Sequence, residues 1–223
     1  MINKIVDSLA AAVADIADGS TILIGGFGGA GMPSALMNAL IEQGAKNLTV
    51  VNNNAGNGET GLAALIAAKQ VKKIICSFPR QADSWHFDKA YRAGDLELEL
   101  VPQGTLAERI RAAGAGIGAF FTPTAFGTQL AQGKETRRIG DREYVLEHPI
   151  HADYALIKAD RGDRWGNLTY RMTARNFGPI MASAAKCTIA QVRETVELGQ
   201  LDPEAVVTPG IFVKRVVKTG ATA

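Results

Sequence analysis

Thr21-Ile-Leu-Ile24, followed at once by Gly25-Gly-Phe-Gly-Gly-Ala-Gly31 and then by Pro33, is the stretch that decides the fold. The four residues before the glycines are β-branched or apolar, which is typical of a short buried strand. Pro33 suits the first turn of a helix, and apolar residues then recur at helical spacing up to Gly44, a helix stop. The stretch therefore predicts a strand, a glycine turn and a helix in direct succession.

The same alternation of strand and helix continues after Gly44. Short apolar runs that predict strands are each followed by a segment with apolar residues at helical spacing. Such alternation indicates a mainly parallel sheet with helices on both faces, so we expect an α/β fold. The expected strands are 48–52, 71–78 and 96–101, the expected helices are 62–69, 84–93 and 105–113, and a helix over 1–18 is expected to open the chain.

Past Gly118 the pattern changes to that of a small antiparallel hairpin. Residues 134–139 and 142–147 are separated by Gly140-Asp141, a pair typical of a two-residue hairpin turn. No linker rich in Pro, Gly or Ser divides the chain, so we expect residues 1–217 to form a single domain and residues 218–223 to be a frayed tail. Beyond the hairpin, strands are expected at 154–158 and 188–192 and a helix at 177–186.

The composition excludes several classes of protein. Apolar residues make up 47% of the chain and charged residues 21%, with a net charge of +2 and no long basic stretch, so nucleic-acid binding is not expected. No apolar run approaches the ~20 residues of a membrane span. Residues 1–7 hold no basic segment that leads into an apolar run, which favours a cytoplasmic location.

The cysteines and histidines do not predict a metal site. Cys76 and Cys187 are far apart and neither belongs to a CxxC pair, so both are expected to be reduced thiols in the interior. His86, His148 and His151 lack the spacing of metal ligands. We therefore expect no bound metal.

Three interpretations of the glycine loop, residues 25–31, are open from the residues alone. Glycines before a helix let the backbone and the helix N-terminus approach an anion such as a phosphate. Gly26, Gly28 and Gly31 also satisfy G-x-G-x-x-G, the pattern of dinucleotide-binding domains. That pattern requires an acidic residue about 20 positions on, where this chain has Asn52-Asn-Asn54. The third interpretation is a tight turn that serves packing alone.

A longer set of motifs resembles a known family. The run from Asp18 to Pro33, which contains the glycine loop, is similar to the signature of the A subunit of family I CoA-transferases, the 3-oxoacid type. The resemblance extends over nearly the whole chain. It continues through Asn52-Asn-Asn-Ala-Gly56, Pro102-Gln-Gly-Thr-Leu-Ala-Glu-Arg-Ile-Arg111, Phe121-Thr-Pro-Thr124 and Ala174-Arg-Asn-Phe177.

The resemblance implies an enzyme that transfers CoA from succinyl-CoA to a 3-oxoacid through a glutamyl-CoA thioester. In the family that glutamate belongs to a B subunit, so a partner chain is implied, with an A2B2 heterotetramer as the expected assembly. CoA and succinyl-CoA act as substrates, and no permanently bound cofactor is implied. A covalent intermediate replaces one difficult displacement by two easier steps. The alternative from another class is a stand-alone module that binds CoA or a sugar phosphate.

The resemblance also implies roles for particular residues. Asn53, Asn54 and Gln103 are expected to line the site and to hold the thioester carbonyl, although amides of this kind also cap turns. Glu59 follows Gly56-Asn-Gly in a loop that could reach the mouth of the site, but it is not expected to be the nucleophile. Glu108 is expected on a solvated helix face or in a weak surface ion pair. The glycine loop is the expected CoA-binding segment, with Gly25, Gly26, Phe27, Gly28, Gly29, Ala30 and Gly31.

The acceptor is expected to be a dicarboxylate. The run from Cys76 to Ser84 is closer to the branch of the family that acts on 3-oxoadipate, in the β-ketoadipate pathway of aromatic catabolism, than to the acetoacetate branch. Arg80 in this run would supply a cation for the second carboxylate. Acetoacetate is the alternative acceptor.

Overall fold

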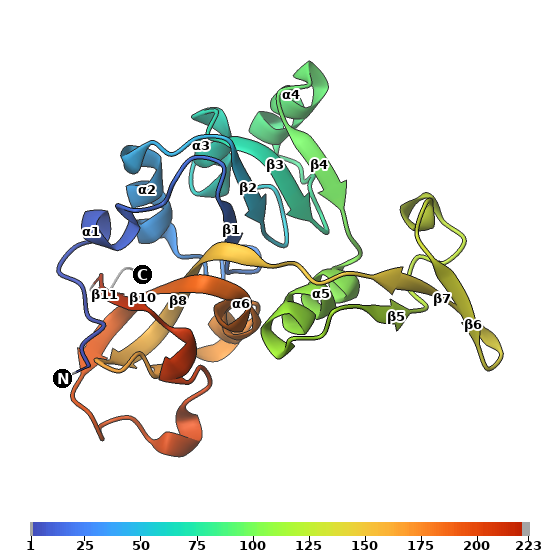
Figure 1. Cartoon of the computed structure of the whole chain (residues 1–223). Helices are drawn as coiled ribbons and strands as arrows, with labels where there is room; N and C mark the ends of the chain where they lie inside the picture. Colours follow the sequence, from blue (N-terminus) through green and yellow to red (C-terminus); the bar gives the residue numbers. More distant parts are fainter. Residues whose placement is uncertain (1, 220–223) are drawn as a thin grey trace.

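A parallel sheet forms the centre of the molecule. The computed structural model describes residues 2–219, and its main sheet has the strand order β11-β10-β8-β1-β2-β3-β4, with β9 paired antiparallel to β8 (Figure 1). All neighbours along the main order run parallel, as predicted. The strands are β1 (Thr21–Ile24), β2 (Leu48–Val51), β3 (Val71–Cys76), β4 (Glu97–Leu100), β8 (Ala152–Asp163), β9 (Leu168–Thr169), β10 (Ala185–Val196) and β11 (Arg215–Lys218).

Helices cover both faces of this sheet, which confirms the α/β prediction. Because successive side chains of a strand point to opposite faces, Ile22 and Ile24 of β1 join one buried cluster and Leu23 joins the other. The first cluster is completed by α1 (Leu9–Val13), α2 (Ser34–Gln43), α3 (Leu62–Ala67) and α4 (Trp85–Ala93). The second is completed by α5 (Gln103–Ala115) and α6 (Gly178–Ala184).

The strand order reverses direction at β1. From β1 the chain moves outward through β2 and β3 to β4, and then returns to place β8 on the other side of β1. In open sheets of this type ligands bind outside the carboxyl ends of the strands, at the point where the order reverses. The glycine loop leaves the carboxyl end of β1 and therefore lies at this point.

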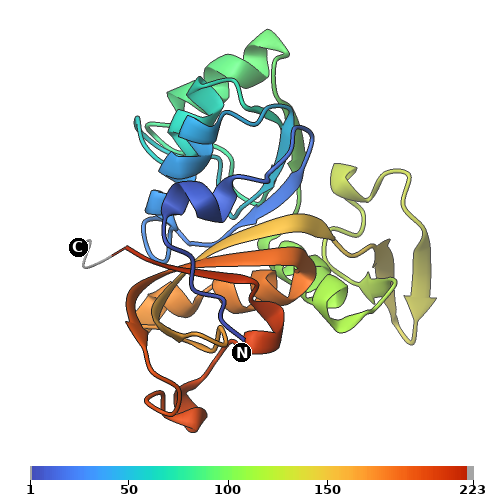
Figure 2. The same cartoon turned by 60° about the vertical axis from the view of Figure 1, so that its left-hand side comes forward.

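An antiparallel excursion projects from the body of the molecule (Figures 1 and 2). The expected hairpin is confirmed as β6 (Thr136–Ile139) and β7 (Arg142–Glu147), and Gly140 in its turn has a φ of +63°. A third strand, β5 (Phe120–Thr122), pairs with the other edge of β7. The sequence does not predict β5, because three residues are too few to show a period.

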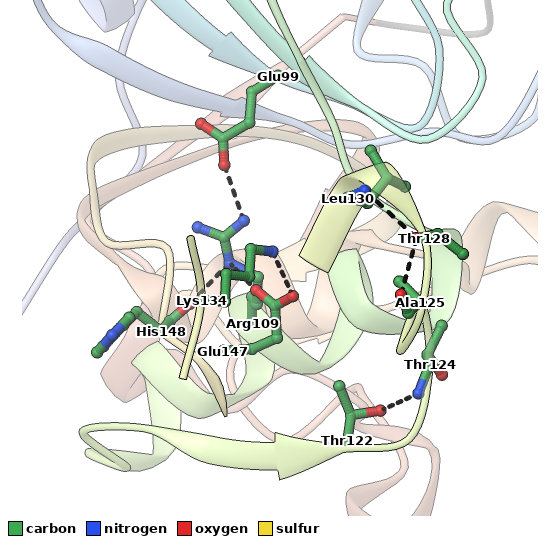
Figure 3. A network of polar contacts seen from close by, with 10 residues as sticks. All are labelled: Glu99, Arg109, Thr122, Thr124, Ala125, Thr128, Leu130, Lys134, Glu147 and His148. Carbon is green, nitrogen blue, oxygen red and sulfur yellow. Dashed lines mark hydrogen bonds and ion pairs between the residues drawn. The ribbon is translucent and has the colours of Figure 1, made fainter. Parts of the chain in front are cut away.

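Buried charges anchor the excursion where it leaves the body (Figure 3). Glu147, with 3% of its side chain exposed, accepts a hydrogen bond from Lys134 at 2.6 Å and lies 3.8 Å from Arg109 of α5. Arg109 in turn donates to Glu99 of β4 at 2.8 Å and to the carbonyl of His148 at 2.7 Å. The network ties the excursion to α5 and to the edge of the main sheet.

Both chain ends depart from the boundaries predicted from the sequence. The expected helix over 1–18 is confined to α1, because the backbone of Lys4 and Val6 hydrogen-bonds with Val216 of β11. Lys218, the expected start of the frayed tail, is the last residue of β11, and the Thr219 N–H donates to the Val192 carbonyl. The rest of the expected tail, 220–223, lies outside the described residues.

Candidate functional site

The glycine loop forms a tight turn that leaves two backbone donors free. Phe27 and Ala30 exchange backbone hydrogen bonds of 2.9 and 3.1 Å, which places Gly28 and Gly29 at the tip. Within residues 2–219 no acceptor meets the N–H groups of Gly28 and Gly29. Two adjacent free N–H groups can bind an oxygen of an anionic ligand.

Close packing explains two of the glycines. A Cβ on Gly26 would lie 2.2 Å from the sulfur of Met32, and one on Gly31 would lie 2.8 Å from the carbonyl oxygen of Ala174. Both residues also have positive φ angles, +115° and +75°. The side chain of Asn176 donates to the Ala30 carbonyl at 3.0 Å. The motif at 174–177 therefore packs directly on the glycine loop, although the two segments are far apart in the sequence.

A pocket of about 490 Å³ lies between the glycine loop and the loop that follows β2. The first turn of α2 contributes Ser34 to its wall, and the preceding Pro33 provides no side-chain cap for the helix. Its lining holds no charged side chain, so an anion there would depend on backbone donors and amides. The lining residues are Gly28, Gly29, Met32, Ser34, Asn38, Asn54, Gly56, Asn57, Thr60, Gly61 and Leu62.

The structure brings two of the three candidate amides into contact. Asn53, 5% exposed at the end of β2, accepts a hydrogen bond on Oδ1 from Nε2 of Gln103 at 2.8 Å. The hydroxyl of Ser77, which follows β3, donates to the same oxygen at 2.8 Å. Both bonds use the amide oxygen, and within residues 2–219 the Nδ2 group of Asn53 has no acceptor. Ser77 carries no sequence signal and was not predicted.

Asn54 is placed differently from Asn53 and Gln103. It lines the pocket, and its Oδ1 accepts from the Gly56 N–H at 2.8 Å. Its own N–H donates to Oδ1 of Asn52, whose Nδ2 donates to the Ile24 carbonyl at 2.7 Å. The asparagines therefore shape the loop after β2, as amides in turns commonly do, and also present polar groups at the site.

Arg80 lies outside the pocket. Its guanidinium donates to both carboxylate oxygens of Asp88 in α4, at 2.8 and 3.1 Å, and more than half of the side chain is exposed. The hydrogen bond from this guanidinium to Asp88 raises the pKa of Arg80. The structure thus places Arg80 in a surface ion pair.

The glutamates compared in the sequence have structural contacts. The Glu59 carboxylate accepts a hydrogen bond from Trp85 Nε1 at 3.0 Å and lies 2.7 Å from His86 Nε2. The hydrogen bond with His86, followed by the one with Trp85, lowers the pKa of Glu59. Glu108 pairs with Arg111 on the surface of α5, in the kind of exposed ion pair that was expected. Neither carboxylate lines the pocket.

The described residues give no support for a reactive cysteine, a metal site or a membrane-spanning helix. Both cysteines are free, and burial raises the pKa of the Cys76 thiol to about 12, so it stays protonated. Among residues 2–219 there is no group of three His, Cys, Asp or Glu side chains placed to hold a metal ion. Over the same residues, every helix is too short or too polar to cross a bilayer.

Comparison with known proteins assigns the chain to a family. The family model described as Coenzyme A transferase matches residues 6–219, and the chain belongs to this family of enzymes. The chain is 67% identical over 223 residues to the A subunit of 3-oxoadipate CoA-transferase from Pseudomonas putida, and this match covers 100% of this chain and 96% of that protein.

One further relative and one solved structure extend the comparison. The chain is 50% identical over 214 residues to the A subunit of a probable succinyl-CoA:3-ketoacid coenzyme A transferase from Bacillus subtilis, covering 96% of this chain and 89% of that protein. Glutaconate coenzyme A-transferase from Acidaminococcus fermentans superimposes with a TM-score of 0.84 over 97% of this chain and 76% of that one. At 21% identity, this last likeness bears on the fold alone.

Proposed function

We propose that this chain is the A subunit of an enzyme that transfers CoA from succinyl-CoA to 3-oxoadipate. The observation that carries the proposal is the 67% identity, over the whole chain, to a protein named as the A subunit of 3-oxoadipate CoA-transferase. The glycine loop and the buried amides support it, because they supply donors for an anionic ligand and for the oxyanion of a thioester. A role in aromatic catabolism through the β-ketoadipate pathway follows from this acceptor.

The reaction in this proposal runs through a carboxylate of a B subunit. That carboxylate attacks the thioester carbonyl of succinyl-CoA and expels the CoA thiolate, which then attacks the resulting anhydride to form a glutamyl-CoA thioester and release succinate. The same steps in reverse load CoA onto the acceptor. Each tetrahedral intermediate carries an oxyanion, and Asn53 Nδ2 is a donor suited to it.

The partner and the cellular setting belong to the same proposal. No carboxylate lines the pocket described above, which supports a nucleophile from a second chain, and we propose an A2B2 heterotetramer. CoA binds as a substrate and not as a resident cofactor. The two free cysteines agree with a reducing compartment, so a cytoplasmic location is proposed.

Acetoacetate is the competing acceptor, because relatives at about half identity are named for 3-ketoacids. The test measures initial rates with succinyl-CoA and each acceptor, using this chain assembled with its B partner chain. We expect a higher kcat/KM for 3-oxoadipate. A preference for acetoacetate would replace the proposed acceptor and leave the CoA-transferase assignment intact.

We propose that Arg80 binds the second carboxylate of the acceptor. To do so, its guanidinium must either release Asp88 or donate to both carboxylates at the same time. Arg80→Ala should then reduce kcat/KM for 3-oxoadipate about tenfold and leave acetoacetate unchanged. An equal loss with both acceptors would remove Arg80 from acceptor selection.

A further inference from the structure

A second pocket, of about 310 Å³, lies against Ala30 of the glycine loop. It is formed by β8 and β10, which continue past the last residue of β1, and by the segment around Arg171. Unlike the pocket beside Asn54, this one is lined by charged side chains. They are Lys158, Asp160, Arg171 and Arg193.

Two cross-strand pairs show that the positive charge in this pocket is only partly neutralised. Arg193 of β10 pairs with Asp160 of the neighbouring β8, and its Nε donates to the carboxylate at 2.8 Å. Lys158 lies opposite Gln191, a neutral residue. The Oε1 atom of Gln191 already accepts from the Leu36 N–H at 3.1 Å. Arg193 therefore has a carboxylate partner on the neighbouring strand, whereas Lys158 has a neutral residue opposite it.

The remaining polar groups of the pocket are donors. Within residues 2–219 neither Lys158 nor Arg171 has an ion-pair or hydrogen-bond acceptor for its side chain. Gln191 as a whole residue is 2% exposed. Within the same described residues its Nε2 atom also has no hydrogen-bond acceptor, and this atom keeps some contact with solvent. A buried amide held through its oxygen, next to two unpaired cations, leaves donors with nothing to bind.

We propose that this pocket binds an anionic group of a substrate, a phosphate or a carboxylate. Lys158 supplies the charge, Arg171 can bind two oxygens of the anion at once, and Gln191 Nε2 supplies a neutral donor from the pocket floor. This inference rests on the proposed function, because that function supplies the two substrates that carry such an anion. The two candidate groups are the phosphates of CoA and, in place of a contact with Arg80, the distal carboxylate of 3-oxoadipate.

The experiment uses the assembled enzyme with Lys158→Met and Arg171→Gln, singly and together. Lys158→Arg keeps the charge. Lys186→Met is the matched control, because Lys186 is exposed and paired with Asp153 away from the pocket. KM is measured for succinyl-CoA, for its analogue without the 3′-phosphate, for 3-oxoadipate and for acetoacetate. Adenosine 3′,5′-bisphosphate and adipate are titrated by calorimetry as probes that need no turnover.

In the double variant, we expect the KM of one substrate to rise about tenfold and the affinity for the corresponding probe to fall by a similar factor. Lys158→Arg should remain close to wild type. A rise for succinyl-CoA that is absent with the analogue assigns the 3′-phosphate. An equal rise with both thioesters and none for 3-oxoadipate assigns the pyrophosphate of CoA. A rise for 3-oxoadipate without one for acetoacetate assigns the carboxylate.

Unchanged KM values and unchanged probe affinities would overturn the proposal. Loss of the B partner chain from the double variant in size-exclusion chromatography would also overturn it, since the cations would then serve the contact between the two chains. If the wild-type assembly transferred CoA to neither acceptor, the proposed function would fail, and the probe titrations would still decide whether the pocket binds anions.

Discussion

At the scale of single residues, the proposed function depends most on the orientation of the Asn53 amide. Its amide oxygen is held by Gln103 of α5 and by Ser77 after β3, so three segments fix which end of the amide is free. Asn53 and Gln103 were predicted from motifs that they share with the family. Ser77 was not, because a single serine is uninformative until the fold places β2 and β3 side by side.

Replacing Ser77 tests this orientation. If Asn53 holds the oxyanion as proposed, Ser77→Ala should lower kcat of the assembled enzyme about threefold to tenfold with a small effect on KM, because the Asn53 amide then loses one of the two bonds that orient it. Ser77→Thr, which keeps the hydroxyl, should restore most of the rate. Steady-state kinetics with succinyl-CoA measure both, and an unchanged kcat in the alanine variant would exclude an orienting role.

The glycine loop offers a matched pair of substitutions. Gly31→Ala should reduce the free energy of unfolding by at least about 1 kcal/mol, because the residue has a positive φ and its Cβ would lie 2.8 Å from Ala174. Gly29→Ala has open space and should have little effect on stability. Urea denaturation of the two variants measures the difference, and equal stabilities would contradict the packing account.

At the scale of elements, the antiparallel excursion depends on its buried anchor. The hairpin was predicted from Gly140-Asp141, but its attachment was not. Glu147 contacts Lys134 within the excursion and Arg109 in α5, and such pairs are visible only in three dimensions (Figure 3). The anchor holds the projecting strands in one orientation relative to the body.

Glu147→Gln tests the anchor with little change in shape. Loss of the carboxylate leaves Lys134 without its buried partner, so the free energy of unfolding should fall by ~1–3 kcal/mol. Amide hydrogens of 120–147 should also exchange faster. Glu135→Gln is the control, because that carboxylate is in an exposed pair with Arg137. Equal effects of the two variants would show that Glu147 has no special part in holding the excursion.

At the scale of the whole molecule, the sequence predicted the fold class and most of the strands. Short apolar runs and glycine stops carry that information locally. The opening helix was overestimated, because residues before α1 pair with β11 at the far end of the chain. The two buried clusters share one sheet, and we propose on this ground that residues 1–217 form a single domain.

Stability should fall in acid because carboxylates in different parts of the molecule have lowered pKa values in the folded state. The pKa of Asp15 is lowered by its hydrogen bond with Arg215, and that of Asp153 by the Thr21 N–H and then by Lys186. Folded-state pKa values below the unfolded value of about 4 give stability that is present above pH 4 and is lost as the pH falls through the folded values. Thermal unfolding across pH 7 to 2 should show this loss.

Asp153→Asn is the matched variant for this prediction. It should unfold at a slightly lower temperature than wild type at pH 7, and the difference should shrink as the pH falls through the lowered pKa of the wild-type carboxylate. A difference that stayed constant across this range would show that ionisation of Asp153 does not contribute to stability.

We propose that this chain forms half of a CoA-transferase whose nucleophile belongs to another chain. The most direct measurement is the intact mass of both chains after the assembled enzyme has been mixed with succinyl-CoA and quenched. We expect a CoA adduct on the B partner chain and an unchanged mass for this chain. A CoA adduct on this chain would contradict the proposal and would place the reactive carboxylate within the present sequence.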